Sequence, residues 1–134
     1  MNTGVEAKWR SYPPFYAWLG AQLERLQDGE CIVRLDPRAE LGNSKGDLHG
    51  GAIAALLDIT LSQAVRSAYS EVVNVSTISM TINYLAPTVG VARASGKVLR
   101  AGASIAYAEG EAVNQQGEVV SRISATYRII RAKA

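Results

Sequence analysis

One segment of the sequence, from about His49 to Ser70, is long and helical in pattern, and the chain after it is almost entirely strand-like. Apolar and polar side chains alternate along residues 75–87, and Pro87 ends that run. Three further strand-like runs, separated by short glycine-containing connections, follow at 90–102, 104–114 and 118–131. One helix followed by four closely connected strands predicts an α+β fold, an antiparallel sheet wrapped around the helix.

Two shorter elements precede the long helix. Residues 13–20 begin with prolines and end at Gly20, which is typical of a short helix. Residues 21–36 alternate on either side of Asp28-Gly29, a favoured two-residue turn, and predict a β-hairpin. Many positions in the later strands are small, which predicts a curved sheet lying close to the helix: Ala92, Ala94, Gly96, Ala106, Ala108 and Gly110.

Length and composition limit the classes of protein that this chain can represent. The 134 residues, 48% of them hydrophobic, are the size of one domain, which we expect to span 1–134. The net charge of +2, without a basic block, argues against a nucleic-acid partner. No run is apolar enough for a membrane span or a secretory leader, so we expect a soluble cytoplasmic protein. With one histidine and one cysteine, Cys31, no metal site and no internal disulfide are expected; Cys31 itself is predicted to be a small core residue.

The long helix contains residues that helix formation alone does not favour. It opens with His49-Gly50-Gly51, although glycine costs about 1 kcal/mol against alanine inside a helix. A lone acid, Asp58, shares a stripe with small and apolar residues and therefore faces protein. Two interpretations stay open: Asp58 either performs chemistry or accepts hydrogen bonds from strand hydroxyls and pins the helix.

The start of this helix is suited to binding an oxyanion. Gly50 and Gly51 leave the first-turn N–H groups without side-chain cover, and the helix dipole favours negative charge there. We expect Asp47 to be the N-cap. Taken alone, His49 is better interpreted as a helix-start residue bonded to a neighbouring carbonyl, and Asn43 as an ordinary loop residue.

The spacing of these groups predicts an oligomer. Gly50 and Asp58 are eight residues apart, which is roughly 12 Å along a helix, so one reacting carbonyl cannot touch both. If they cooperate, they come from different chains whose helices run antiparallel. That arrangement is a twofold dimer with two composite sites.

A spaced set of residues in this region resembles the hot-dog-fold acyl-CoA thioesterases, in particular the group with the phenylacetate-pathway and 4-hydroxybenzoyl-CoA thioesterases. The set is Asn43, His49, Gly50, Gly51, Leu57 and Asp58. The likeness covers most of the chain. It implies a hot-dog fold, hydrolysis of an aryl or medium-chain acyl-CoA, and an obligate homodimer that pairs further into a homotetramer.

The resemblance also implies roles for individual residues. Gly50 would donate its backbone N–H to the thioester carbonyl, and Asp58 of the partner subunit would be the nucleophile or the general base. His49 and Asn43 would orient the thioester or the water, and Thr77 would help to hold the water or the carboxylate. No cofactor is implied, since CoA is part of the substrate.

Substrate contacts are implied by position only. The segments 84–89 and 100–107 fall where relatives hold the pantetheine arm and the nucleotide. The substrate-binding residues expected on this basis are Gly51, Tyr84, Leu85, Pro87, Arg100, which is a candidate for a phosphate, and Gly102.

Two alternatives to a thioesterase remain at this point. One is a hot-dog enoyl hydratase or dehydratase, which moves protons at a β-carbon. The other is a noncatalytic module that binds acyl-CoA or an acyl carrier, in which Asp58 would be structural. The acyl group depends on how Leu61, Tyr69 and Met80 pack at the dimer seam.

Overall fold

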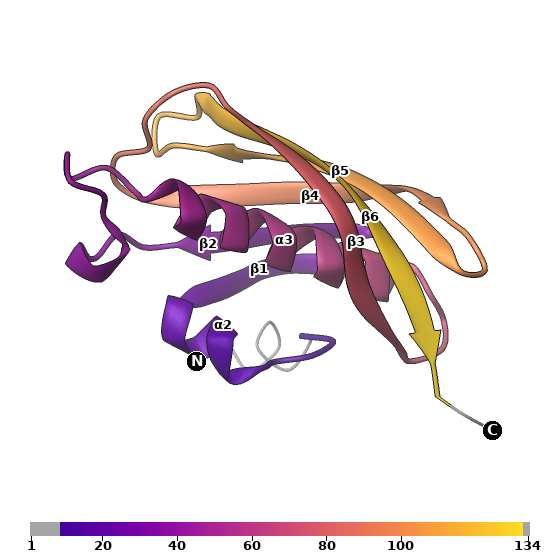
Figure 1. Ribbon diagram of the computed structural model, residues 1–134. Coiled ribbons are helices and arrows are strands. Elements are labelled where there is room, and N and C mark those ends of the chain that lie inside the picture. The colour runs from indigo at the N-terminus through magenta and orange to yellow at the C-terminus, as the bar shows by residue number, and fades with distance from the viewer. Residues whose placement is uncertain (1–8, 133–134) are drawn as a thin grey trace.

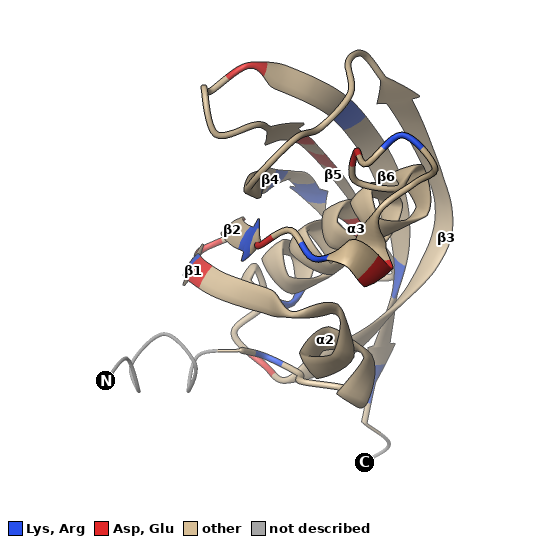
Figure 2. Cartoon of the chain, turned by 90° about the vertical axis from the view of Figure 1, so that its left-hand side faces the viewer, with Lys and Arg blue, Asp and Glu red and all other residues tan. Residues whose placement is uncertain are grey.

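Six antiparallel strands form one sheet that curves around a single long helix in the computed structural model, which describes residues 9–132 (Figures 1 and 2). The helix α3 (Gly50–Ser67) lies against the concave face, preceded by α2 (Pro14–Leu19) and a 3-10 turn η1 (Ala39–Leu41). The predicted α+β architecture is confirmed. In spatial order the strands are β1 (Ala21–Gln27), β2 (Glu30–Leu35), β4 (Ala92–Ala101), β5 (Ile105–Val113), β6 (Val119–Arg131) and β3 (Val73–Tyr84).

The turns form where the sequence predicts them. Asp28 and Gly29 both have positive φ, 50° and 83°, which matches the twist of the β1–β2 hairpin. Gly20 ends α2 in the left-handed conformation, with φ 86°. Cys31 is buried among the core side chains, as predicted.

The core lies between α3 and the concave face of the sheet. Leu57, Leu61 and Val65 are fully buried on the helix, and small residues face them from β4 and β5. Gly96 and Gly110 are paired directly across these two strands, and a Cβ on either would lie under 3 Å from Leu61 Cδ1. The prediction of a close approach between sheet and helix is therefore correct at these positions.

Several element boundaries differ from the predicted ones. The helix ends at Ser67 rather than near residue 70, and β3 begins earlier and ends at Tyr84, before Pro87. The N-cap is His49, so the prediction of Asp47 was wrong. Asp47 instead bonds within the preceding loop, where its N–H donates to Asn43 Oδ1 and its carbonyl accepts from Asn43 N.

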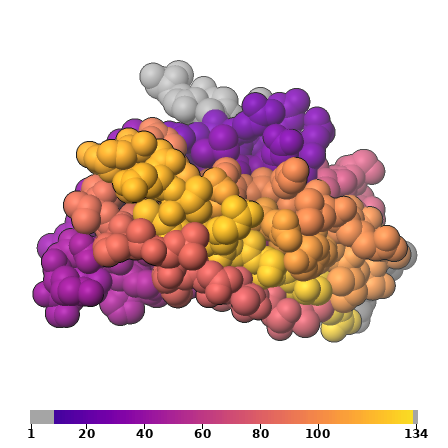
Figure 3. Space-filling view, turned by 90° about the horizontal axis from the view of Figure 1, so that it is seen from above, coloured from indigo at the N-terminus to yellow at the C-terminus, as the bar shows by residue number. Residues whose placement is uncertain are grey.

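Strand β3 is an edge strand, because it pairs with β6 and with no other strand of the described chain. Most of its side chains are exposed, and they include the large apolar groups of Ile78, Met80 and Tyr84. From above, strands β3 to β6 cover most of the visible face (Figure 3). Within residues 9–132, no helix is both long and apolar enough to cross a membrane.

Candidate active site

The start of α3 leaves one backbone donor unused. His49 caps the helix: its Nδ1 accepts the Gly51 N–H at 2.8 Å, and its carbonyl oxygen accepts from Ala52 and Ile53. The expectation that the Gly51 amide is free was therefore wrong. The Gly50 N–H has no acceptor among residues 9–132, so it remains available at the positive end of the helix dipole.

The side chain of His49 is fixed by this cap. Because Nδ1 accepts a hydrogen bond, a neutral ring carries its proton on Nε2. The ring is exposed. Its observed partner is a backbone N–H rather than the carbonyl that the alternative interpretation requires.

Asp58 lies eight residues further along the helix and is half-buried. Its Oδ1 accepts two hydroxyl hydrogen bonds, from Thr77 Oγ1 in β3 at 3.0 Å and from the Tyr127 hydroxyl in β6 at 2.8 Å. No donor within the described part of the chain reaches Oδ2. The strand hydroxyls that a helix-pinning role requires are thus present, and they occupy only one of the two carboxylate oxygens.

A β-bulge explains how Thr77 reaches the helix. Strict alternation would put Thr77 on the opposite face of β3 from Met80. The register with β6 shifts between Thr77 and Ser79, so Ile78 is the extra residue and Thr77 faces α3 together with Met80. Thr77 is directly opposite Tyr127 in this register, which brings both hydroxyls to one carboxylate oxygen.

Asn43 organises the loop before α3. Its Oδ1 accepts the backbone N–H groups of Lys45 at 2.9 Å and Asp47 at 3.0 Å, the pattern of an Asx turn. The side-chain carbonyl is therefore occupied by the fold. Within residues 9–132 its Nδ2 donates to no protein acceptor, so that group alone is left to orient a substrate or a water.

Two hollows lie along the open side of α3. The first, of about 350 Å³, brings Asn43 and Gly50 together with the predicted substrate-binding residues Tyr84, Leu85 and Pro87. The Tyr84 hydroxyl donates to the Gly50 carbonyl oxygen at 2.7 Å. The second, of about 340 Å³, contains Asp58 and Gly51 and is otherwise lined by Phe15, Tyr16, Ala54, Ala55, Ile59, Ser62 and Met80.

Arg100 and Gly102 lie away from both hollows, at the opposite end of the helix. Gly102 is in the β4–β5 connection, and its carbonyl oxygen accepts from the hydroxyl of Tyr69, just beyond the end of α3. Arg100 is exposed near the end of β4. One protomer therefore does not bring these two residues to Gly50, and a shared site for them needs a second chain.

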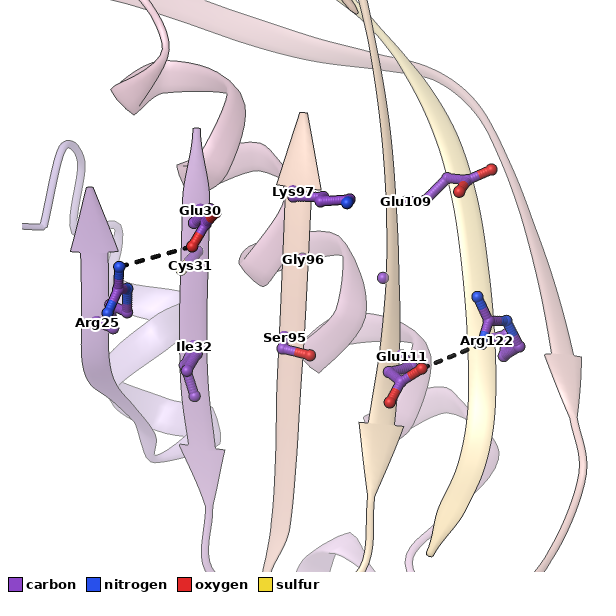
Figure 4. A pocket seen from close by; sticks show the side chains of 11 residues that line it. Arg25, Glu30, Cys31, Ile32, Ser95, Gly96, Lys97, Glu109, Glu111 and Arg122 are labelled. Carbon is purple, nitrogen blue, oxygen red and sulfur yellow. Dashed lines mark hydrogen bonds and ion pairs between the residues drawn. The ribbon is translucent and has the colours of Figure 1, made fainter. Parts of the chain in front are cut away.

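A further groove, of about 450 Å³, lies on the outer face of the sheet, opposite α3 (Figure 4). Two ion pairs lie at its sides: Arg25 with Glu30 at 3.6 Å, between β1 and β2, and Arg122 with Glu111 at 3.1 Å, between β6 and β5 (Figure 4). These are exposed pairs, which contribute little to stability. The groove contains none of the predicted site residues.

Tyr127 is the site residue that sequence reasoning missed. Its ring is fully buried in β6, and its hydroxyl reaches Asp58. Burial, followed by the negative charge of Asp58 and the hydrogen bond to it, raises the pKa of Tyr127 above its usual range. The group therefore stays protonated and acts as a donor. The only signal in the sequence is a tyrosine on the inward face of the last strand.

The fold and the site together define a hot-dog protein, and comparison with known proteins gives its family. A family model described as the thioesterase superfamily matches residues 45–121, which is more than half of the chain. The chain belongs to this superfamily.

Individual relatives agree with this assignment. The Halobacterium salinarum protein named "Putative esterase VNG_1336C" is 38% identical over 98 residues, which cover 69% of this chain and 65% of that protein, just under two thirds of its length. The structure of the conserved protein PA5202 from Pseudomonas aeruginosa has a TM-score of 0.85 and 29% identity, over 90% of this chain and 97% of that chain. The PaaI protein of E. coli, from the phenylacetic acid degradation operon, shares the fold at 20% identity, with a TM-score of 0.85 over 96% and 97% of the two chains.

Proposed function

We propose that this protein hydrolyses acyl-CoA thioesters to a free acid and CoA. The observation that carries the proposal is a matched pair of unused groups on α3: the Gly50 N–H at the helix start and Oδ2 of the half-buried Asp58. Membership of the thioesterase superfamily supports thioester hydrolysis as the reaction class. CoA as the carrier, and an aryl or medium-chain acyl group, are parts of the proposal.

The two groups match the needs of the reaction. Attack on the thioester carbon puts negative charge on the carbonyl oxygen, which the Gly50 N–H and the helix dipole stabilise. Asp58 either takes a proton from the attacking water or bonds to the carbon itself, giving an anhydride that water then opens. In both routes the carbon–sulfur bond breaks, and CoA leaves as a thiolate that takes up a proton.

The site is proposed to form between two protomers. Gly50 and Asp58 are roughly 12 Å apart along one helix, too far for one carbonyl to contact both. The open edge of β3, with its exposed apolar side chains, supports pairing with a second copy about a twofold axis. In such a dimer each Asp58 would approach the Gly50 of the partner. Further pairing into a tetramer, and a cytoplasmic location, are also part of the proposal.

A substrate panel tests the reaction class. The purified protein is incubated with aryl-, short- and medium-chain acyl-CoAs, and released thiol is followed. We expect hydrolysis that falls by a factor of about 10² to 10⁴ in Asp58→Asn. Tight CoA-ester binding without any thiol release would instead indicate a binding module, and a change in enoyl absorbance would indicate a hydratase.

A proline substitution tests the oxyanion donor. Gly50 is the first helical residue, where proline is tolerated, and His49 before it has ψ 138°, the conformation favoured ahead of proline. Gly50→Pro therefore removes the N–H without breaking the helix, although its ring also adds a Cβ beside Tyr84 and a Cδ in place of the amide hydrogen. We expect kcat to fall about 10²- to 10³-fold in a folded protein. Gly50→Ala, which keeps the N–H, is the control; its Cβ would meet only Tyr84, at 3.4 Å.

Mixed dimers test the composite site. If Asp58 and Gly50 act across the interface, a heterodimer of one Asp58→Asn protomer and one Gly50→Pro protomer contains one intact site. Activity should therefore reappear when the two inactive variants are co-expressed. Persistent inactivity of verified heterodimers would show that each site is built from one chain.

A further inference from the structure

Tyr127 is positioned by the fold to control how Asp58 presents its carboxylate. The ring is buried between α3, β3 and β5: Thr77 and Ala106 are its register partners on the two neighbouring strands. Its hydroxyl is 2.8 Å from Asp58 Oδ1 and 3.3 Å from the Asp58 backbone oxygen. The Tyr127 hydroxyl has one proton to donate, and both acceptors within its reach belong to Asp58, so its hydrogen bond goes to that residue.

The hydrogen bonds at Asp58 are unequal between its two oxygens. Oδ1 accepts both Tyr127 and Thr77, whereas Oδ2 has no donor within residues 9–132. No described salt bridge includes Asp58. Two neutral hydroxyls, one of them rigidly buried, are therefore what holds this carboxylate in place.

We infer that Tyr127 is a positioning residue: with Thr77 it fixes Oδ1 and so turns Oδ2 of Asp58 toward the substrate. The inference rests on the proposed thioesterase function. In the reaction Oδ2 takes the proton of the attacking water, or forms the new bond to the thioester carbon, while Oδ1 keeps its two hydrogen bonds. Tyr127 touches neither reacting atom and acts only through Asp58.

Two features distinguish this role from simple packing. Holding one oxygen restricts rotation of the carboxylate, which raises kcat without binding the substrate. The effect also depends on both donors to one oxygen, so that losing either the Tyr127 or the Thr77 hydroxyl should weaken it and a conservative change that keeps the hydroxyl should not.

Tyr127→Phe is the direct test, since it keeps the buried ring and removes only the hydroxyl. We expect kcat to fall about 10- to 100-fold with KM almost unchanged. Thr77→Val removes the other donor to the same oxygen from an exposed strand position, and should also lower kcat with KM almost unchanged. Thr77→Ser keeps the hydroxyl and should restore wild-type behaviour.

Thr60→Val is the matched control for losing a buried hydroxyl. Its Oγ1 donates to Leu56 O at 2.7 Å within α3 and does not touch Asp58, so kcat should stay at the wild-type value. A Tyr127→Phe protein with unchanged kcat would overturn the inference. A change confined to KM or to the melting temperature would overturn it too, because it would mean that the hydroxyl has only a packing role.

A spectroscopic comparison separates this inference from the proposed function. The Asp58 side chain is labelled with ¹³C at the carboxyl carbon, and its resonance is compared at one pH in the wild type, Tyr127→Phe and Thr60→Val. A resonance displaced in Tyr127→Phe but not in Thr60→Val supports control of the carboxylate by Tyr127, even if no acyl-CoA is turned over. An unchanged resonance in Tyr127→Phe overturns it, even if the wild type proves to be an active thioesterase.

Discussion

The contact between Leu61 and the glycine pair of β4 and β5 sets how close α3 lies to the sheet. An added Cβ on Gly96 would lie 2.6 Å from Leu61 Cδ1, and its next neighbour, Glu109 O, would be at an ordinary 3.5 Å. The strain in Gly96→Ala therefore comes from one side chain, Leu61. Shortening Leu61 to alanine should remove the strain.

The expected free energies follow from these contacts. Overpacking costs about 1–3 kcal/mol, and alanine recovers about 0.5–1 kcal/mol over glycine in a strand, so Gly96→Ala should destabilise by about 0–2.5 kcal/mol. Leu61 is fully buried, and Leu61→Ala should cost about 2–5 kcal/mol. In the double variant the new methyl group enters space that the leucine has left. The double variant should thus lose no more free energy of unfolding than Leu61→Ala alone. It should be more stable than the sum of the two single changes predicts, by about 1–3 kcal/mol.

Urea unfolding followed by circular dichroism measures this cycle, at one protein concentration because association would shift the midpoint. Gly110→Ala is the comparison. Its Cβ would meet Leu61 Cδ1 at 2.7 Å but also the backbone oxygen of Ser95 at 2.5 Å, and the second contact remains after Leu61→Ala. Rescue should therefore be strong for Gly96→Ala and weak for Gly110→Ala. Additive free energies at both glycines would refute the reasoning.

Three other predictions concern the polar side chains of Gln63, Asn43 and Cys31. Gln63, fully buried, accepts the Arg10 N–H at 2.9 Å and donates to Ser11 O at 3.0 Å; Gln63→Leu should cost about 1–3 kcal/mol in urea unfolding and speed proteolytic cleavage before α2. Asn43→Asp keeps the loop acceptor but replaces the Nδ2 donor with a charged carboxylate oxygen, so kcat should fall while the melting temperature holds, whereas Asn43→Ala should lower both. Burial raises the pKa of the Cys31 thiol from 9.0 to about 12. The unfolded chain therefore loses this proton first, and stability should fall as pH rises from 9 toward 12, by up to about 1.4 kcal/mol per pH unit, and less steeply in Cys31→Ala.

The overall fold could be predicted because its signals are local. Asp28-Gly29 specifies a tight turn through its own backbone, and the alternation along residues 118–131 marks β6 without reference to any other strand. The end of α3 was harder to predict from the sequence, because its last residue, Ser67, makes a contact with a distant segment. The Ser67 hydroxyl accepts the Gly29 N–H at 2.8 Å. Helix ends that depend on contacts with distant segments cannot be predicted from the local sequence pattern.

Asp47 and His49 are both candidates for the N-cap of α3, and residue type alone does not decide between them. Aspartate is a good capping residue, and Asp47 is three residues before Gly50, the first residue of the helix. The Asx turn at Asn43 instead uses the backbone of Asp47, and His49, next to Gly50, takes the capping position with Nδ1. The general preference for aspartate at the N-cap therefore did not decide this position, because the Asx turn at Asn43 already uses the backbone of Asp47.

The surroundings of Asp58 depend on contacts between segments far apart in the chain. Thr77 is 19 residues away and Tyr127 is 69, and they meet only because β3 pairs with β6 in one register and bulges at Ile78. Without the bulge Thr77 would point to the other face of the sheet, and the carboxylate would lose one donor. Because β3 is also the open edge through which a second copy is proposed to pair, the strand that would complete the dimer is the same strand that holds the acid. Substitutions that shift the β3 register should therefore impair the orientation of Asp58 as well as association, and the two losses should appear together.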